Sequence, residues 1–350
     1  MDHTQLNALR DELAGEIVSR HYRQNPPLAA RHGAEGRAKC LEDTRDHLSY
    51  LAESVSAGRP TLFVEYTAWM ASVLSARNVP MEELRESLGT MREVLLEKLP
   101  DASGFLAGCL DEGLAQLGRA RVEPPTFIPA DGPHAELARA YLDALLDGKR
   151  HVASKLVMDA VKSGVSIRDL YLHVFQKAQY EAGRLWQLNR VSVAQEHYCT
   201  AAAQFIISQL YPYIFSHERN GRTLVATCVS GDLHEIGVRM VADFFEMDGW
   251  DSFYLGANTP DDSVVQTVLE RHADVLAISA TLTAHVEQVR ALIARVRGNP
   301  ALSHVRILVG GLPFNLEPEL WQRVGADGHA QTADQAVGLA NALVRERRAG

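Results

Sequence analysis

The stretch of sequence that decides the fold reads TLVATCVSGDLHEIG and covers residues 223–237. Its first half is a short apolar run rich in β-branched residues, which is typical of a buried strand. Ser230 and Gly231 end this run, and a helical pattern follows at once. Asp232 and His234 therefore lie in a turn at the carboxyl end of a strand. In an open α/β sheet, ligands bind at that end of the strands.

Three further apolar runs follow the first, at residues 253–255, 275–279 and 305–309. A helical stretch separates each run from the next. Strands that alternate with helices predict parallel βαβ units, and hence a Rossmann-like or flavodoxin-like doubly wound sheet. We assign this α/β domain to residues 221–350.

The chain before this domain reads as helical. Apolar residues recur every three or four positions in residues 1–120 and again in 133–217, which predicts an all-helical N-terminal domain and a four-helix cap. Residues 121–132 lie between them and contain the segment PPTFIP, whose three prolines favour an extended linker. The predicted fold class is thus multidomain, with α domains followed by an α/β domain.

The composition excludes several classes of protein. Apolar residues make up 46% of the 350 residues, yet no run approaches the roughly 20 apolar residues of a membrane span. The net charge is −9 and no segment concentrates Lys or Arg, which argues against direct nucleic-acid binding. The four cysteines lack CxxC spacing, so they predict neither a disulfide framework nor a zinc site. The polar N-terminus lacks signal-peptide features, so we expect a cytoplasmic protein. We also expect it to form a homo-oligomer.

Residue types at three predicted strand ends indicate a binding site. Asp232 can accept one ring N–H of His234, which leaves the other imidazole nitrogen for a metal and increases its basicity. Gly237 lets the start of the helix approach a bulky ligand. Residues 279–281 (Ser-Ala-Thr) end the third strand, and residues 310–311 (Gly-Gly) end the fourth. The plainer interpretation is an ordinary flavodoxin-like domain with a capping aspartate, a surface histidine and glycine turns.

The order Asp-x-His-x-x-Gly, then Ser-x-Thr, then Gly-Gly resembles the cobalamin-binding domain shared by methionine synthases, corrinoid methyl carriers and mutases. The resemblance implies that His234 is the lower axial ligand of cobalt, in place of the vitamin's own base, and that Asp232 supports it. It also implies four residues around the nucleotide tail of the vitamin: Ser279, Thr281, Gly310 and Gly311. Thr281 stands where many members have leucine, so this one contact departs from the pattern. The resemblance covers residues 221–345.

The predicted cap carries a second pattern. Trp186 lies near the end of one predicted helix, and Ser192 begins the next helix with a capping box. That helix places Val193, Glu196 and His197 within its first two turns. We expect these side chains to converge with the tryptophan at one end of two antiparallel helices. The spacing is Trp, nine residues, then Glu-His.

This spacing resembles the light-sensing module of cobalamin-dependent photoreceptors. The resemblance implies that Trp186 packs against the 5′-deoxyadenosyl group, that Val193 lines the wall beside it and that Glu196 contacts the sugar. It implies that His197 becomes the upper cobalt ligand after light cleaves the cobalt–carbon bond. The chain would then be an adenosylcobalamin light sensor and not an enzyme. The alternatives are a corrinoid methyl carrier of a methyltransferase system, a passive cobalamin carrier, or ordinary packing residues.

The N-terminal domain departs from the light-responsive repressors, which begin with a basic helix-turn-helix. The domain order, a helical domain followed by the cap and the cobalamin-binding domain, resembles that of the photocobilins, in which a helical N-terminal domain holds a bilin such as biliverdin. Phe63, Tyr66, Trp69 and Met70 are candidates for the wall of such a pocket, and they fit a hydrophobic core equally well. The sequence identifies no bilin-contacting residue beyond this set, and it does not identify the downstream protein partner. A dimerisation bundle is the plainer alternative.

Overall fold

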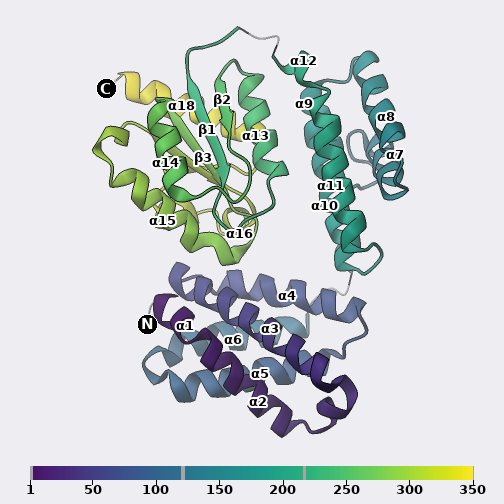
Figure 1. The fold of residues 1–350 in the computed structure, drawn as a ribbon, viewed down its shortest axis with the longest axis vertical. Coiled ribbons are helices and arrows are strands. Elements are labelled where there is room, and N and C mark those ends of the chain that lie inside the picture. The colour runs from purple at the N-terminus through teal and green to yellow at the C-terminus, as the bar shows by residue number, and fades with distance from the viewer. Residues whose placement is uncertain (1–2, 120–122, 216–217, 350) are drawn as a thin grey trace. The chain divides into compact units, whose positions relative to one another are not determined.

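The computed structural model of the protein describes residues 3–119, 123–215 and 218–349 (Figure 1). The predicted boundaries near residues 120–122 and 216–217 lie outside the described residues. The chain forms two compact units. The N-terminal unit comprises the chain up to residue 122 together with residues 282–287 and 312–324, and the C-terminal unit comprises the remainder.

The N-terminal unit is helical, as the apolar periodicity predicts. Its long helices pack around a core that includes leucine, methionine and aromatic side chains. The helix α3 (Pro27–Ala57) bends at Gly33, whose φ of 62° is a left-handed conformation that suits glycine. The N-terminal helices are α1 (His3–Ala8), α2 (Arg10–Gln24), α3 (Pro27–Ala57), α4 (Pro60–Ala76), α5 (Met81–Lys98), η1 (Pro100–Ala102) and α6 (Ser103–Leu117).

Three of the four candidate bilin-wall residues are core residues in this structure. Phe63, Tyr66 and Met70 are 0%, 5% and 8% exposed and belong to the core of the N-terminal unit. The Tyr66 hydroxyl lies 2.7 Å from Nδ1 of His47, and burial lowers the pKa of this histidine to about 4. Trp69 is 37% exposed. The packing interpretation therefore holds for three of the four side chains.

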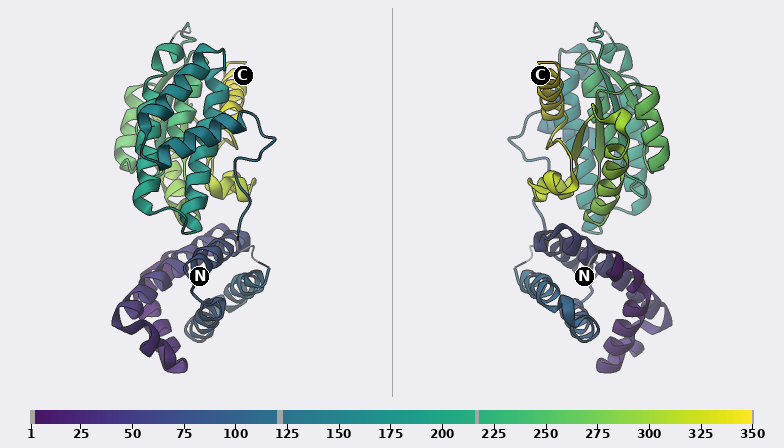
Figure 2. Two further views of the ribbon diagram at one scale, coloured as in Figure 1. Left: turned by 90° about the vertical axis from the view of Figure 1, so that its right-hand side faces the viewer. Right: turned by 90° about the vertical axis from the view of Figure 1, so that its left-hand side faces the viewer.

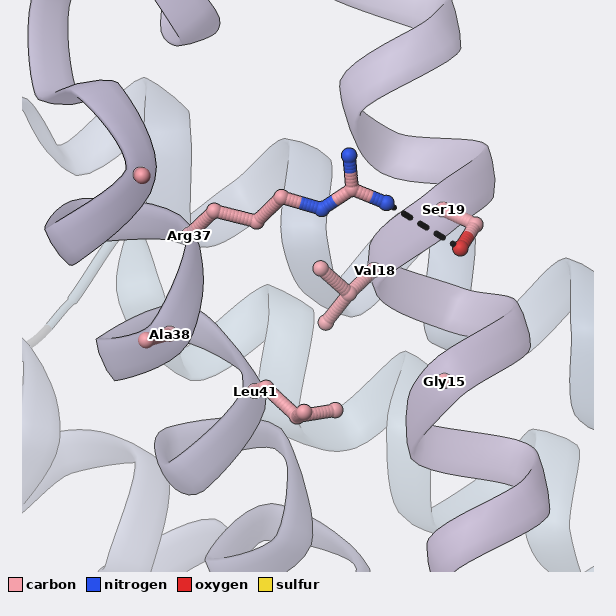
Figure 3. A pocket seen from close by; sticks show the side chains of 7 residues that line it. Gly15, Val18, Ser19, Arg37, Ala38 and Leu41 are labelled. Atoms are coloured by element: carbon pink, nitrogen blue, oxygen red, sulfur yellow. Dashed lines mark hydrogen bonds between the residues drawn. The ribbon is translucent and has the colours of Figure 1, made fainter.

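A pocket of about 330 Å³ opens elsewhere in the N-terminal unit, between α2 and α3 (Figure 3). Arg37 of α3 extends across it and donates a hydrogen bond of 3.4 Å to the hydroxyl of Ser19 on α2. The lining residues are Gly15, Val18, Ser19, Ala34, Arg37, Ala38 and Leu41. None of the four candidate bilin-wall residues lines this pocket.

The C-terminal unit contains a parallel sheet with the strand order β2-β1-β3-β4-β5, which confirms the predicted doubly wound α/β fold. The strands are β1 (Thr223–Cys228), β2 (Asp251–Tyr254), β3 (Val275–Ser279), β4 (Arg306–Gly310) and β5 (Gly328–His329). The fifth strand has two residues, too short for a sequence pattern to reveal. The helices that follow the strands in the sequence are α13 (Ile236–Glu246), α14 (Asp261–Glu270), α15 (Val286–Arg297), α16 (Leu312–Leu316), α17 (Leu320–Val324) and α18 (Ala333–Ala349). Of these, α16 and α17 belong to the N-terminal unit.

The cap consists of helices on one face of this sheet. In Figure 2 the cap helices stand in front of the sheet from one side and behind it from the other. Their apolar side chains join one core with those of α13, α18 and the strands. The cap helices are α7 (Ala135–Leu146), α8 (Arg150–Lys162), α9 (Ile167–Asp169), a π-helical segment (Leu170–Phe175), α10 (Gln176–Gln187), α11 (Val193–Ser208) and α12 (Tyr211–Ile214). In the described part of the chain, no helix combines the length and apolar composition that a membrane span requires.

The described part of the predicted linker is fixed to α10. The N–H of Phe127 donates to the carboxylate of Glu181 at 2.8 Å, and Arg184 donates to the carbonyl of Pro124 at 3.1 Å. Glu181 and Arg184 pair with each other at 2.6 Å and are 6% and 7% exposed. This buried ion pair, which also bonds the backbone, attaches the segment to α10. The prolines of the linker predict an extended backbone. They do not predict its attachment to α10, the helix that carries Trp186.

Candidate functional site

The turn after β1 holds an aspartate and a histidine in one hydrogen-bonded unit. Asp232 is fully buried, and its Oδ1 accepts the backbone N–H of His234 at 3.0 Å. The same oxygen lies 2.8 Å from Nδ1 of the His234 ring, whose side chain is 56% exposed. The bond to Nδ1 fixes the ring and leaves Nε2 as the nitrogen available to a metal. The predicted pair is thus formed in the structure.

Asp232 is held in place by the loops after β2 and β3, the two strands that flank β1. Its Oδ2 accepts the backbone N–H of Thr281 at 2.6 Å, just beyond the end of β3. Its carbonyl accepts the N–H of Asn258, and the Asn258 side chain accepts the N–H of Gly231 at 2.8 Å. Because Thr281 contributes its backbone here, threonine in place of leucine leaves this hydrogen bond unaffected.

The electrostatics of the site favour a basic imidazole. The hydrogen bond with Asp232 raises the pKa of His234, burial opposes this shift, and the charges of Asp232 and Glu196 add to the increase. A carboxylate on one ring nitrogen makes the other nitrogen a stronger metal ligand. The contribution of Glu196 also indicates that the start of α11 lies within electrostatic reach of the histidine.

The other two strand ends meet beside this turn. Ser279 and Gly310 are paired in register between β3 and β4, and the N–H of Ala280 donates to the Gly310 carbonyl at 3.1 Å. A Cβ on Gly311 would lie 2.0 Å from the Ala280 carbonyl oxygen, and its φ is +100°, so only glycine fits there. A Cβ on Gly237 would meet open space. The assignment of Ser279, Thr281 and the two glycines to a nucleotide tail stays a prediction.

The cap carries a second carboxylate–histidine pair. Ser192 caps α11 with the predicted capping box. Oε2 of Glu196 lies 2.6 Å from Nδ1 of His197, and the Thr200 hydroxyl donates to Oε1 of the same carboxylate at 3.3 Å. The side chain of His197 is 75% exposed. Trp186 is half-buried in the last turn of α10, which packs against α11.

Two apolar side chains next to these pairs are exposed. Leu233, which directly precedes His234, is 73% exposed, and Val193 of α11 is 53% exposed. A flat, largely apolar ring that brings its own equatorial ligands needs axial nitrogens and apolar contacts from the protein. The residues present therefore fit a cobalt corrinoid with His234 on one side of the ring.

Sequence reasoning missed one residue of the site. Glu235, which follows His234, accepts hydrogen bonds from Gln204 of the cap, from the Tyr254 hydroxyl and from the N–H of Ala257. An acidic residue at the start of a helix is commonly explained by the helix dipole, so its pattern gave no reason to select it.

Comparisons with known proteins agree with this site. Residues 222–338 match a family model described as B12 binding domain, and residues 137–211 match a second model with the same description. The first match contains the Asp232–His234 pair. The second contains the tryptophan and the Glu196–His197 pair of the cap.

Named relatives are corrinoid proteins. A corrinoid protein of Desulfitobacterium hafniense (strain Y51) is 27% identical over 207 residues, which cover 57% of this chain and 94% of the relative. Dimethylamine corrinoid protein 3 of Methanosarcina acetivorans is 29% identical over 128 residues, or 36% of this chain and 59% of the relative. The structure of the Methanosarcina barkeri monomethylamine corrinoid protein has the same fold, with a TM-score of 0.53, 20% identity, and coverage of 59% of this chain and 98% of that chain.

The geometry and the two domain matches lead to one conclusion. A buried aspartate orients a histidine at the carboxyl edge of a parallel sheet; one B12-domain match contains this pair, and the other covers the cap. The chain is a cobalamin-binding protein.

Proposed function

We propose that this protein is a light sensor that uses adenosylcobalamin. The observation that carries the proposal is the exposed Glu196–His197 pair at the start of α11, which mirrors the Asp232–His234 pair of the sheet domain. Adenosylcobalamin, when bound, would supply a cobalt–carbon bond that visible light breaks. His234 would hold the corrinoid from the sheet domain, and His197 would be the cap residue available to cobalt once the adenosyl group had left.

The other cap residues support this role. Trp186 would pack against the adenosyl group and Glu196 would contact its sugar, so both would lose a partner if that group left. Loss of those contacts shifts the cap toward a second arrangement, as in any switch whose states differ in ligand contacts. The signal passes to a protein partner, the chain acts as a homo-oligomer, and it catalyses no reaction itself.

A second candidate function is that of a methyl carrier for a methyltransferase. The printed names of the relatives favour this function over light sensing, because they include dimethylamine and monomethylamine corrinoid proteins. In a carrier, His234 keeps the same role and the cap covers a small methyl group. The carrier therefore has no use for a second histidine presented by a carboxylate, and the cap pair favours the sensor.

Illumination tests the two functions against each other. We expect the protein loaded with adenosylcobalamin in the dark to change its absorbance spectrum under green light and then to hold a stable product. That product should differ from the one that the His197→Ala variant gives under the same lamp, because a second histidine replaces water on cobalt only in the wild type. A photostable complex, or a product identical to that of His197→Ala, would favour the carrier.

We also propose that the N-terminal unit binds biliverdin without a covalent bond. Support comes from the domain order and from Trp69, the exposed member of the aromatic set, since flat conjugated ligands stack on rings. Added biliverdin should give the full chain a structured red absorption band, which fragment 133–350 should lack. Denaturation should release the pigment. A spectrum equal to that of free biliverdin would instead indicate a dimerisation or docking bundle.

A further inference from the structure

Polar residues recur along one face of the helix that follows His234. Glu235 is the N-cap of α13, Arg239 lies one turn further and Asp243 another turn beyond. Residues four apart on a helix lie above one another, so the three side chains form one stripe. Each bonds to a helix of the cap, and all of these contacts lie within the C-terminal unit.

The first contact is made by the residue next to the histidine. Oε1 of Glu235 accepts a hydrogen bond from the Gln204 side chain of α11 at 2.8 Å. Its Oε2 accepts from the Tyr254 hydroxyl at 2.9 Å and from the N–H of Ala257 at 3.1 Å. One carboxylate therefore joins the cap, the end of β2 and the loop beyond it. Hydrogen bonds to an ionised acceptor are roughly twice as strong as neutral ones.

The second and third contacts continue along α13. Arg239 donates to the hydroxyls of Ser208 at 2.7 Å and Tyr211 at 3.2 Å, and its guanidinium lies over the Tyr211 ring. Asp243 accepts from the Tyr171 hydroxyl at 2.7 Å, and both side chains are buried. The partners Gln204 and Ser208 are four residues apart on α11, the same spacing as Glu235 and Arg239 on α13. Both contacts therefore repeat with one turn of each helix. Tyr171 belongs to the π-helical segment, a rare conformation that is frequent at functional sites.

We infer that Glu235 is a positioning residue for corrinoid binding, which fastens the cap to the loop that carries His234. The stripe formed with Arg239 and Asp243 sets the register of the cap on the sheet domain. Opening the cap to admit or release the corrinoid must break the Gln204–Glu235 bond, since this contact lies at the end of the stripe beside the histidine. The inference requires cobalamin binding alone and holds for a sensor and for a carrier.

The test is the rate at which loaded hydroxocobalamin leaves the protein into excess competing apoprotein or scavenger. We expect Gln204→Ala and Glu235→Ala each to raise the release rate by about tenfold, as loss of a charged hydrogen bond allows. The double variant should release no faster than the Glu235→Ala single variant, because both changes remove the same bond. The histidine-ligated spectrum of the loaded variants should match that of the wild type, which a collapsed site would not give.

Two matched variants separate the cap contact from general loosening. Ser154→Ala removes a hydrogen bond to Gln209 of 2.9 Å that lies within the cap, and it should leave the release rate unchanged. If Glu235→Ala folds poorly, Ser208→Ala replaces it in the test, because this variant removes the hydroxyl that accepts from Arg239. Ser208→Ala should raise the release rate by itself, and its effect should add to that of Gln204→Ala. Release that Gln204→Ala leaves unchanged, or that Ser154→Ala accelerates equally, would overturn the inference.

Discussion

Replacing His234 with alanine is expected to weaken corrinoid binding by about 100-fold or more and to abolish the histidine-ligated absorbance spectrum. Loss of a partner that merely orients a metal ligand costs roughly 10–100-fold in metal affinity, so loss of the ligand itself costs at least the upper figure. The exposed position of the ring predicts little effect on folding. Equilibrium titration of the apoprotein with hydroxocobalamin, followed by absorbance, measures both quantities.

Two variants place this result in context. Asp232→Asn keeps the shape of the side chain but removes the charge that raises the pKa of His234 and replaces one of its two accepting oxygens with an N–H₂ group, so we expect a loss of at least about tenfold with the histidine still bound. Leu233→Ala alters the exposed neighbour of the histidine and should retain the histidine-ligated spectrum. If His234→Ala binds with unchanged affinity and spectrum, another residue ligates the cobalt and the assignment is wrong.

The sequence allowed the sheet and the lower-face pair to be predicted because both depend on local pattern. The apolar run of β3 was located to the residue, and a motif at a strand end must lie at the carboxyl edge of a parallel sheet. The capping box of α11 is likewise local, since Ser192 and Gln195 are three residues apart and both of its hydrogen bonds form.

Features that depend on residues distant in sequence could not be predicted. Glu235 matters because Gln204 and Tyr254 meet it, and each lies at least 19 residues away along the chain. The Glu181–Arg184 pair is an ordinary helical spacing until the linker backbone is seen to bond to it. Similarly, the pattern of the candidate bilin-wall residues in α4 is the same whether they line a pocket or form a core. Only the packing shows that Phe63 is fully buried.

Replacing His197 with alanine is expected to change the product of illumination and to leave the dark complex intact. The dark complex depends on His234 and on the packing of the cap, neither of which uses the 75% exposed ring of His197. After green light, the wild type should hold cobalt between two histidines, whereas His197→Ala should give the spectrum of a corrinoid with histidine on one face only. Absorbance spectra of both proteins, recorded before and after the same exposure, measure the difference.

The carboxylate beside this histidine supplies the control. Glu196→Gln removes the charge next to Nδ1 of His197 but keeps a hydrogen-bond acceptor there, so the two-histidine product should still form and should decay faster. Thr200→Val removes only the hydroxyl that donates to Glu196 and should behave as the wild type. Identical product spectra for the wild type and His197→Ala would remove His197 from the mechanism. In that case the exposed pair on α11 is a surface feature, and the carrier function becomes the better account of the cap.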